Sequence, residues 1–169
     1  MVFDCFTYFN DELITELRLH ILDKFVDKFI IVEATTDHSG KKKNLNFNLE
    51  KFSSFKHKIR YIVVDDLPKN TKPFYYNKRK WHENMVREEY QRNQIMRGLF
   101  DAKDEDLIII SDNDEIPNLK NIHDISFRRY AVFNQKFYKY KFNLLSEGQT
   151  PYQGSRIIRK KYLKKNITP

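Results

Sequence analysis

"IIISDNDEIP", residues 108–117, places three isoleucines one residue before Asp112, Asn113 and Asp114. The run of apolar, β-branched residues predicts a strand that is buried on both faces, as the strands of parallel sheets are. The polar side chains that follow would then lie at the carboxyl edge of the sheet, where open α/β sheets bind their ligands. This stretch therefore predicts a parallel α/β sheet with two carboxylates at its ligand-binding edge.

Strand and helix patterns alternate along the chain before this stretch. Short apolar runs predict strands at residues 1–9, 28–34, 59–66 and 106–111. Helical spacing predicts a helix over residues 11–26, with Leu13, Leu17 and Ile21 on its buried face, and a long helix over residues 81–100. Such alternation predicts right-handed crossovers and a mostly parallel sheet flanked by helices.

The pattern changes in the last third of the chain. Residues 118–125 predict a short helix, and residues 129–145 and 155–163 predict longer β segments that are rich in aromatic and basic side chains. An α/β part is therefore followed by a β-rich part.

The chain is expected to fold as one domain over residues 1–169, because its length is typical of a domain and no linker or repeat divides it. Hydrophobic residues make up 40% of the sequence, including 14 Phe and 10 Tyr, so a sizeable core can form. Within this domain we distinguish an α/β half, residues 1–117, from a basic, β-rich half, residues 118–169.

Positive charge is concentrated near the carboxyl terminus. Residues 136–169 hold nine Lys and Arg against one acid, Glu147, which accounts for the whole formal net charge of +8. Such asymmetry is typical of a protein with an anionic partner, whether a phosphorylated ligand, a nucleic acid or a membrane surface. A solvated basic face has the same composition.

Missing motifs exclude several classes of protein. The single Cys5 rules out an internal disulfide and a multi-cysteine zinc site. With only four glycines the chain has neither a G-x-G-x-x-G loop nor a P-loop, and it has no H-E-x-x-H or G-x-S-x-G motif. No stretch approaches the roughly 18 apolar residues of a transmembrane helix, and the first residues do not resemble a signal peptide. We therefore expect a soluble, cytoplasmic protein.

The two acids of the opening stretch predict a divalent cation. Carboxylates one residue apart repel each other, and burying them without a partner is costly. Their oxygens suit Mg²⁺ or Mn²⁺, which take further ligands from water and from substrate phosphates. An EF-hand is excluded, because Pro117 and His123 stand where its loop requires Gly and Glu. The alternative is that Asp114 caps a helix that begins near Glu115.

Five segments, taken together and in order, resemble glycosyltransferase family 17. They are DCFTYFNDELITELRLHIL (4–22), VDKFIIVEATTDHSGKKK (26–43), VVDDLP (63–68), WHENMVREEYQRNQIMRGL (81–99) and DLIIISDNDEIP (106–117). The resemblance runs from Phe3 to about Leu163. The family contains a β-1,4-mannosyl-glycoprotein β-1,4-N-acetylglucosaminyltransferase. Membership implies a GT-A fold, a Rossmann-like sheet whose D-x-D motif holds a divalent metal against the diphosphate of a nucleotide sugar.

The resemblance also implies site residues by position. Asp112 and Asp114 match the D-x-D motif, with Asp114 as the direct ligand of Mn²⁺ or Mg²⁺ and Asp112 closer to the donor sugar or ribose. Further residues implied for the nucleoside, the diphosphate or the sugars are Asp4, Cys5, Phe6, Glu33, Arg92, Gln153, Gly154 and Arg156.

Two of these residues could instead have purely structural roles. Glu33 could cap a turn. The guanidinium of Arg92 could reach the diphosphate or hold Asp112 by a bidentate pair, and the structural alternative is an ordinary surface salt bridge.

The implied reaction moves a sugar, GlcNAc first of all, from a UDP-sugar such as UDP-GlcNAc to a glycan acceptor with inversion. The metal and nearby cations would stabilise the negative charge on the leaving nucleoside diphosphate. One carboxylate would act as general base on the acceptor hydroxyl, with Glu147 and Glu115 as the candidates. Domains of the family usually extend further than residue 169, so some acceptor contacts are expected to lie outside this chain. Peripheral membrane contact is compatible with this activity.

Two other functions remain open. A metal-diphosphate site would also serve a nucleotidyltransferase. The basic residues between Lys136 and Lys165 alternate with aromatic residues such as Phe137, Tyr138 and Tyr140, which is typical of proteins that bind single-stranded nucleic acids. The same alternation is typical of an amphipathic strand, and a glycosyltransferase needs no nucleic-acid partner.

Overall fold

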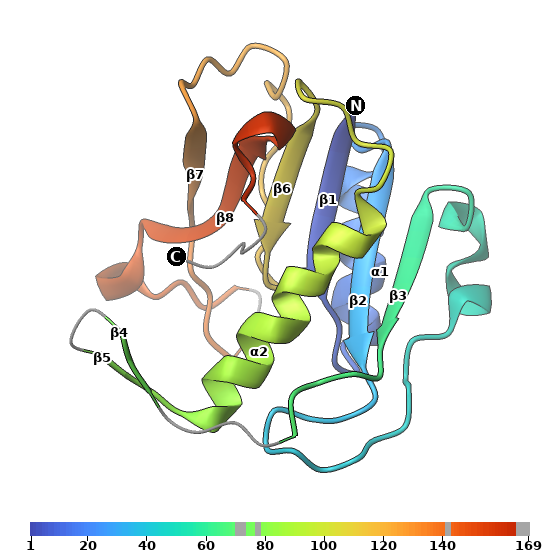
Figure 1. Cartoon of the computed structure of the whole chain (residues 1–169). Helices are drawn as coiled ribbons and strands as arrows, with labels where there is room; N and C mark the ends of the chain where they lie inside the picture. The colour runs from blue at the N-terminus through green and yellow to red at the C-terminus, as the bar shows by residue number, and fades with distance from the viewer. Residues whose placement is uncertain (70–73, 77–78, 141–142, 165–169) are drawn as a thin grey trace.

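The computed structural model describes residues 1–69, 74–76, 79–140 and 143–164. Its main element is a six-stranded sheet with strand order β3-β2-β1-β6-β8-β7 (Figure 1). The strands are β1 (Val2–Thr7), β2 (Lys28–Ala34), β3 (Ile59–Val64), β6 (Leu107–Ser111), β7 (Tyr130–Gln135) and β8 (Tyr152–Arg159). Strands β3, β2, β1 and β6 are parallel to one another, whereas β8 is antiparallel to β6 and β7. The predicted α/β class with a mostly parallel sheet is therefore confirmed.

Two helices cover the two faces of this sheet. Helix α2 (Glu83–Asn93) crosses one face, and helix α1 (Glu12–Leu22) lies behind β1 and β2 on the other (Figure 1). The short 3₁₀ helices are η1 (Leu49–Phe55), η2 (Gln94–Gly98), η3 (Glu147–Gln149) and η4 (Lys160–Tyr162). A separate antiparallel hairpin consists of β4 (Phe74–Tyr76) and β5 (Arg79–Trp81).

Each face of the sheet has its own hydrophobic core. Because side chains alternate along a strand, Phe6 of β1 packs with α1, whereas Phe3 and Cys5 pack on the face of α2. All three side chains have no solvent exposure, as expected for a strand with both faces covered. A large apolar side chain buried in this way contributes about 1.5–3 kcal/mol relative to exposure. This double burial explains the continuous apolar run of the central strands.

The buried face of α1 is not the predicted one. Leu13, Leu17 and Ile21 were expected inside, yet their side chains are 69%, 40% and 44% exposed. The buried residues of α1 are Thr15, Arg18, Leu19 and Leu22. Both sets have helical spacing, so the prediction was right about the period and wrong about the phase.

Three further expectations are corrected. The helix predicted over residues 81–100 is replaced by the end of β5, then α2 and η2. Residues 118–125 form turns instead of a helix, although Leu119 and Ile122 still reach the core on the α1 face. The β segment predicted over residues 129–145 stops with β7, and the described residues beyond it contribute only one isolated bridge.

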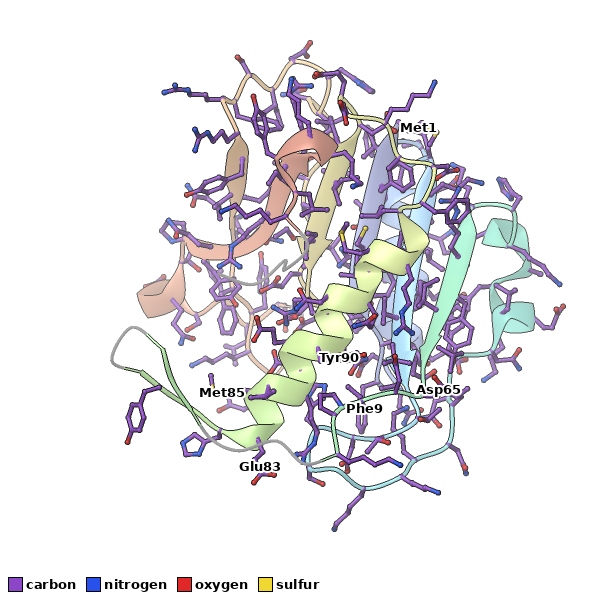
Figure 2. All side chains as sticks on the ribbon, viewed as in Figure 1. Met1, Phe9, Asp65, Glu83, Met85 and Tyr90 are labelled. Carbon is purple, nitrogen blue, oxygen red and sulfur yellow. The ribbon has the colours of Figure 1, made fainter. Side chains whose placement is uncertain are left out.

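The parallel strands end at one edge of the sheet, which we call the carboxyl edge. In Figure 2, Met1 lies near the opposite, amino edge and Phe9 lies beyond the end of β1 at the carboxyl edge. Within the described ranges, no helix is both long and apolar enough to cross a membrane.

Candidate active site

A cleft of about 1410 Å³ opens at the carboxyl edge. Thr7 and Phe9 line it where the chain leaves β1, and the turn of residues 112–116 lines it where the chain leaves β6. Other lining residues come from the start of α1, from residues 118–125 and from the end of β7 with the segment after it. Four of the lining side chains are carboxylates, and they belong to Asp11, Asp112, Asp114 and Glu115. The cleft is therefore acidic where the central strands end.

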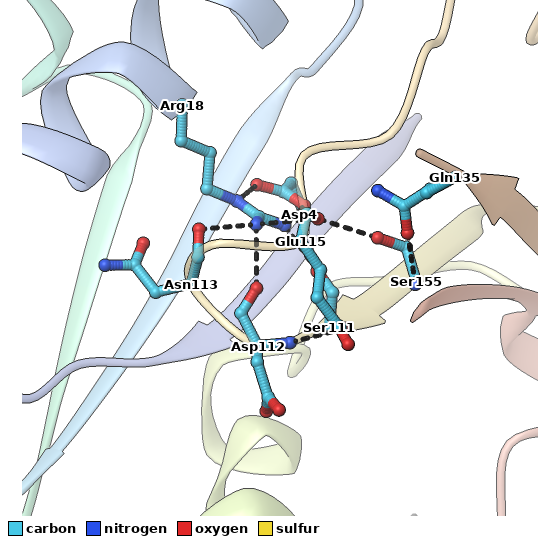
Figure 3. A network of polar contacts seen from close by, with 8 residues as sticks. All are labelled: Asp4, Arg18, Ser111, Asp112, Asn113, Glu115, Gln135 and Ser155. Carbon is cyan, nitrogen blue, oxygen red and sulfur yellow. Dashed lines mark hydrogen bonds and ion pairs between the residues drawn. The ribbon is translucent and has the colours of Figure 1, made fainter. Parts of the chain in front are cut away.

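Beneath the cleft, Arg18 of α1 holds the turn of residues 112–115 from inside the protein. Its guanidinium forms two hydrogen bonds with the carboxylate of Asp4, from Nε (2.7 Å) and Nη2 (2.6 Å). Nη2 also donates to Ser111 Oγ at 2.5 Å. Nη1 lies 3.0 Å from the carbonyl oxygen of Asp112 and 3.1 Å from those of Asn113 and Glu115 (Figure 3). Arg18 and Asp4 are both fully buried.

Asp112 has its carbonyl and its carboxylate on opposite sides. The carbonyl accepts from Arg18, and the carboxylate points away from it (Figure 3). Outside, Arg92 Nη2 of α2 donates to the Asp112 carboxylate at 2.7 Å and to Glu88 at 3.1 Å. Arg92 thus pairs with Asp112, which was one of the roles expected for it, although through one hydrogen bond and not two. The Asp112 side chain stays 51% exposed.

Asp114 lies on the exposed side of the same turn. Among the described residues, no cation comes within ion-pair distance of its carboxylate. Burial, followed by the negative charge of Asp114, raises the pKa of the neighbouring Asp11. No helix begins near Glu115, so Asp114 does not act as a helix cap. Asp114 therefore leaves uncompensated negative charge in the cleft.

Glu115 is the half-buried acid of the turn. Its Oε2 accepts from the Asp112 amide at 3.0 Å, and its Oε1 accepts from the Tyr152 hydroxyl at 2.9 Å. Burial raises the pKa of Glu115; these two hydrogen bonds oppose the rise, and the charges of Asp112 and Asp114 add to it. The Glu115 carboxylate is thus held in a fixed orientation at the wall of the cleft.

Asn113 fixes the turn to the start of α1. Its Nδ2 donates to Thr15 Oγ1 at 2.9 Å, and Thr15 in turn donates to the Asp11 carbonyl at 2.8 Å. Asn113 Oδ1 is the one buried side-chain polar atom of the described residues that lacks a hydrogen-bond partner. The Asn113 side chain is therefore buried, whereas Asp112 and Asp114 on either side of it are exposed.

The acids suit a cation site that water and substrate complete better than a site built from protein ligands alone. Within the described part of the chain, no three His, Cys, Asp or Glu residues gather closely enough to hold a metal ion by themselves. Asp112 and Asp114 nevertheless line one cleft with hard carboxylate oxygens. Mg²⁺ and Mn²⁺ are commonly bound by one or two carboxylates while water and substrate phosphates complete their coordination. The residues present fit such an ion.

Three residues expected beside a nucleoside lie below the cleft instead. The side chains of Asp4, Cys5 and Phe6 have no solvent exposure, because both faces of β1 are covered. Asp4 pairs with Arg18, burial raises the pKa of the Cys5 thiol, and the Arg18 guanidinium carbon lies 4.7 Å from the centre of the Phe6 ring. In this region the residues that line the cleft are Thr7, the last residue of β1, and Phe9 just beyond it.

Glu33, also expected beside the nucleoside, organises a loop. Its carboxylate accepts from the Lys43 ammonium group, from the amides of Asn46 and Phe47, and from the Tyr61 hydroxyl. Burial alone would raise the pKa of Glu33, but these hydrogen bonds hold it below its ordinary value of 4.5. The fully buried Glu33 thus fixes the position of residues 43–47, and it is not among the residues that line the cleft.

The expected residues of β8 have different positions. Gly154 is buried, and a Cβ there would lie 2.3 Å from Gln135 Oε1 and 3.1 Å from the Glu115 carboxyl carbon. Gly154 therefore makes room for the Gln135 side chain and, next to it, for the Glu115 carboxylate. Arg156 is exposed and pairs in register with Ile110, on the face of α2 and away from the cleft lining. Gln153 is exposed beside Asn134 and is likewise not among the lining residues.

Glu147, one of the two expected general bases, does not line the cleft. It lies exposed at the start of η3. Glu115 does line the cleft, and it lies next to Asp114. Of the two candidates, the structure brings only Glu115 to the acids.

Sequence reasoning missed Arg18. The signal was indirect: an acid in the middle of a strand buried on both faces, Asp4, requires a cationic partner. Arg18 is the first arginine of the sequence and shares a helical stripe with Leu19 and Leu22. Pairing these two observations would have identified both Arg18 and the correct buried face of α1.

Taken together, the fold and the site define an α/β protein with an acidic, cation-compatible cleft at the carboxyl edge of its sheet. The model of glycosyltransferase family 17 matches residues 1–147 of this chain. The chain therefore belongs to glycosyltransferase family 17 and is a glycosyltransferase by family. The match covers the sheet from β1 to β7 and the whole acidic turn, and it ends before β8. No curated protein matches the chain.

Proposed function

We propose that this protein is a metal-dependent glycosyltransferase with a GT-A fold, which transfers a sugar, GlcNAc first of all, from a UDP-sugar to a glycan acceptor with inversion. The observation that carries the proposal is the pair of exposed acids, Asp112 and Asp114, in a cleft at the carboxyl edge of a parallel sheet. In such sheets this edge binds the ligand. Family membership adds that the ligand is a sugar donor.

The donor side of the cleft is assigned to the 112–114 turn and α2. Asp114, which has no cationic partner among the described residues, binds Mn²⁺ or Mg²⁺ together with Asp112. A bound divalent ion supplies positive charge that stabilises the leaving diphosphate. Arg92, 2.7 Å from Asp112, adds a fixed positive charge on the α2 side of this turn. Carboxylates and guanidinium together thus suit a metal diphosphate.

The acceptor side is assigned to the wall formed by residues after β7 and by Tyr152. Three aromatic side chains that line the cleft are strongly exposed: Tyr138 (43%) and Tyr140 (96%) from the segment after β7, and Phe9 (59%) from the segment after β1. Exposed aromatic surface in a groove marks a binding site, and flat rings suit the apolar faces of sugars. Glu115, between this wall and the acids, is the carboxylate placed to accept the proton of the acceptor hydroxyl.

The charge distribution favours this function over nucleic-acid binding. The cleft lining carries four acids against two lysines, Lys120 and Lys136. Two of the basic residues near the carboxyl terminus, Arg159 and Lys161, pair with Glu105 at the amino edge, and Lys141 and Lys165 lie outside the described residues. A polyanion would therefore meet net negative charge in the cleft, whereas a diphosphate would bind together with a divalent cation that offsets this charge.

Calorimetry tests the proposal. Titration with UDP and with UDP-GlcNAc should give binding that depends on Mn²⁺, and Asp114→Asn should abolish it. Glu105→Gln at the amino edge is the matched control and should bind as the parent protein does. If the folded protein binds none of a panel of nucleotide sugars with or without Mn²⁺, the proposal is wrong. Mass spectrometry of the product would distinguish sugar transfer from nucleotidyl transfer.

A further inference from the structure

We propose that Arg18 is the positioning residue of the active site, and that it sets the direction of the Asp112 and Asp114 carboxylates by binding the backbone of the turn that carries them. This inference rests on the proposed metal-dependent function. Among the described residues, the side chains that Arg18 hydrogen-bonds are the buried Asp4 and Ser111, neither of which lines the cleft, so it acts on the cleft through the backbone of the turn.

The contacts of Arg18 use the shape of the guanidinium group. It presents five N–H donors in one plane. The Nε and Nη2 edge meets the Asp4 carboxylate, which supplies the compensating charge. Nη1 on the other side meets three carbonyl oxygens of one turn, those of Asp112, Asn113 and Glu115, at 3.0–3.1 Å. Lysine has a single ammonium nitrogen and cannot serve both sets of acceptors.

The convergence of these carbonyls determines where the acids point. At Asp112 the carbonyl is turned inward and the carboxylate lies on the other side of the chain (Figure 3), and the inward carbonyls of Asn113 and Glu115 fix the backbone on both sides of Asp114. Three of the four carbonyl groups of residues 112–115 are turned inward. Their oxygen atoms carry partial negative charge and would repel one another without a donor between them. A buried cation in this place therefore stabilises the one turn conformation that exposes Asp112 and Asp114.

Other contacts also hold this turn, and one of them is a backbone hydrogen bond from the Glu115 amide to the Asp112 carbonyl at 3.1 Å. Ser155 Oγ donates to the Glu115 carbonyl at 2.7 Å, and the Glu115 carboxylate accepts from the Asp112 amide. Asn113 is tied to Thr15 through its side chain. Among the described residues, only Arg18 donates to the Asn113 carbonyl, and only Arg18 joins it to the carbonyls of Asp112 and Glu115. The turn is expected to persist without Arg18 but to sample more than one arrangement of its carbonyls.

A merely structural ion pair would predict a different outcome. If Arg18 serves only to neutralise Asp4, then replacing it changes stability and leaves metal affinity in the folded protein unchanged. If it positions the acids, metal affinity falls in protein that remains folded. Groups that orient metal ligands typically contribute about 10–100-fold to metal affinity.

The test compares Arg18→Lys with Arg60→Lys. Arg60 also pairs with an aspartate, Asp101, through two hydrogen bonds, and it also donates to a backbone carbonyl, that of Gly98, but it lies near the start of β3 at the amino edge. Each folded variant is titrated with Mn²⁺ in the presence of UDP, and amide hydrogen exchange is followed at residues 112–115. We expect Arg18→Lys to weaken Mn²⁺ binding about 10–100-fold and to speed exchange in this turn. Arg60→Lys should change neither.

The possible outcomes distinguish failure of the role proposed for Arg18 from failure of the proposed metal-dependent function. Mn²⁺ binding by folded Arg18→Lys within about twofold of the parent protein overturns the positioning role. If Arg18→Lys does not fold, the pair Asp4→Leu with Arg18→Met removes both charges, an exchange that buried ion pairs often tolerate, and the same criteria apply. If the parent protein itself does not bind Mn²⁺ with UDP, the proposed function fails, and unchanged exchange at residues 112–115 still overturns the role of Arg18 in the turn.

Discussion

The two edges of the parallel sheet differ in how far their charged side chains are neutralised by other residues. At the amino edge the charges compensate one another: the terminal ammonium of Met1 lies 2.6 Å from Asp106, Arg60 pairs with Asp101, and Glu105 pairs with Arg159 and Lys161. At the carboxyl edge, Asp114 has no cationic partner in the described part of the chain, and Asp112 shares Arg92 with Glu88. At the amino edge these charges are neutralised within the protein, whereas at the carboxyl edge negative charge remains that a ligand can neutralise.

This difference separates stability from function. Ion pairs near the amino edge can contribute to the folded state, although exposed pairs contribute little. Unpaired acids at the carboxyl edge contribute nothing favourable by themselves, and their mutual repulsion is a cost that a bound cation removes. Changes beneath the carboxyl edge should therefore alter both stability and activity, changes on its surface should alter activity alone, and changes at the amino edge should alter neither by much.

The largest expected effect follows from breaking the buried pair beneath the carboxyl edge. Arg18→Met leaves the Asp4 carboxylate buried without a partner, so the free energy of unfolding should fall by about 3–5 kcal/mol. Chemical denaturation followed by circular dichroism measures the change. Asp4→Leu combined with Arg18→Met should recover most of the loss, and failure to recover it would mean that the pair stabilises the fold beyond charge compensation.

A change on the surface of the cleft should affect activity without affecting stability. Asp114→Asn removes a charge from an exposed side chain, so the free energy of unfolding should stay within about 0.5 kcal/mol of the parent value. Metal-dependent transfer should fall by roughly 100-fold or more, because even groups outside the ligand shell reach that effect. Activity assays with Mn²⁺ and UDP-GlcNAc provide the measurement. A variant that keeps full activity would exclude Asp114 as a metal ligand.

Acid should weaken the protein through Glu33. In the folded protein its pKa lies below 4.5, so below that value the unfolded chain binds the proton first. The stabilisation from Glu33 is therefore complete above about pH 4.5 and is lost as the pH falls through the folded pKa. In Glu33→Gln, unfolding free energies measured between about pH 7 and pH 3 should decline less steeply on the acid side. An unchanged acid slope would contradict this assignment.

The two general-base candidates should differ in effect. Glu115→Gln should lower the turnover number markedly, because Glu115 lines the cleft beside the acids, whereas Glu147→Gln should leave turnover unchanged, because Glu147 is exposed outside the lining. Steady-state kinetics on both variants makes the comparison. Equal losses in the two would indicate that the segment around η3 closes over the acceptor.

The smallest effect is expected at the amino edge. Glu105→Gln removes the exposed partner of Arg159 and Lys161, where an aqueous ion pair is screened and weak. Thermal unfolding should shift slightly or not at all, and activity should be unchanged. A clear loss of activity would show that the two edges are coupled, against the comparison above.

Local sequence patterns by themselves determined the order of the elements in the α/β half. The strands β1, β2, β3 and β6 were predictable because segments of five to seven mostly apolar residues, flanked by turn residues, have few other stable arrangements. The position of Asp112 and Asp114 at the carboxyl edge followed from the same run, since a parallel strand must end there. Family membership could also be recognised from ordered segments of this half.

Only the tertiary structure decided which face of α1 is buried and which acids reach the cleft. Two stripes of α1 share the helical period, and local pattern cannot choose between them. Burying Asp4 without a cation would cost more than leaving Leu13, Leu17 and Ile21 partly exposed, so Arg18 takes the inner face. Asp4 and Glu33 likewise stay buried and outside the cleft lining because both faces of their strands are covered, and that depends on helices distant in sequence.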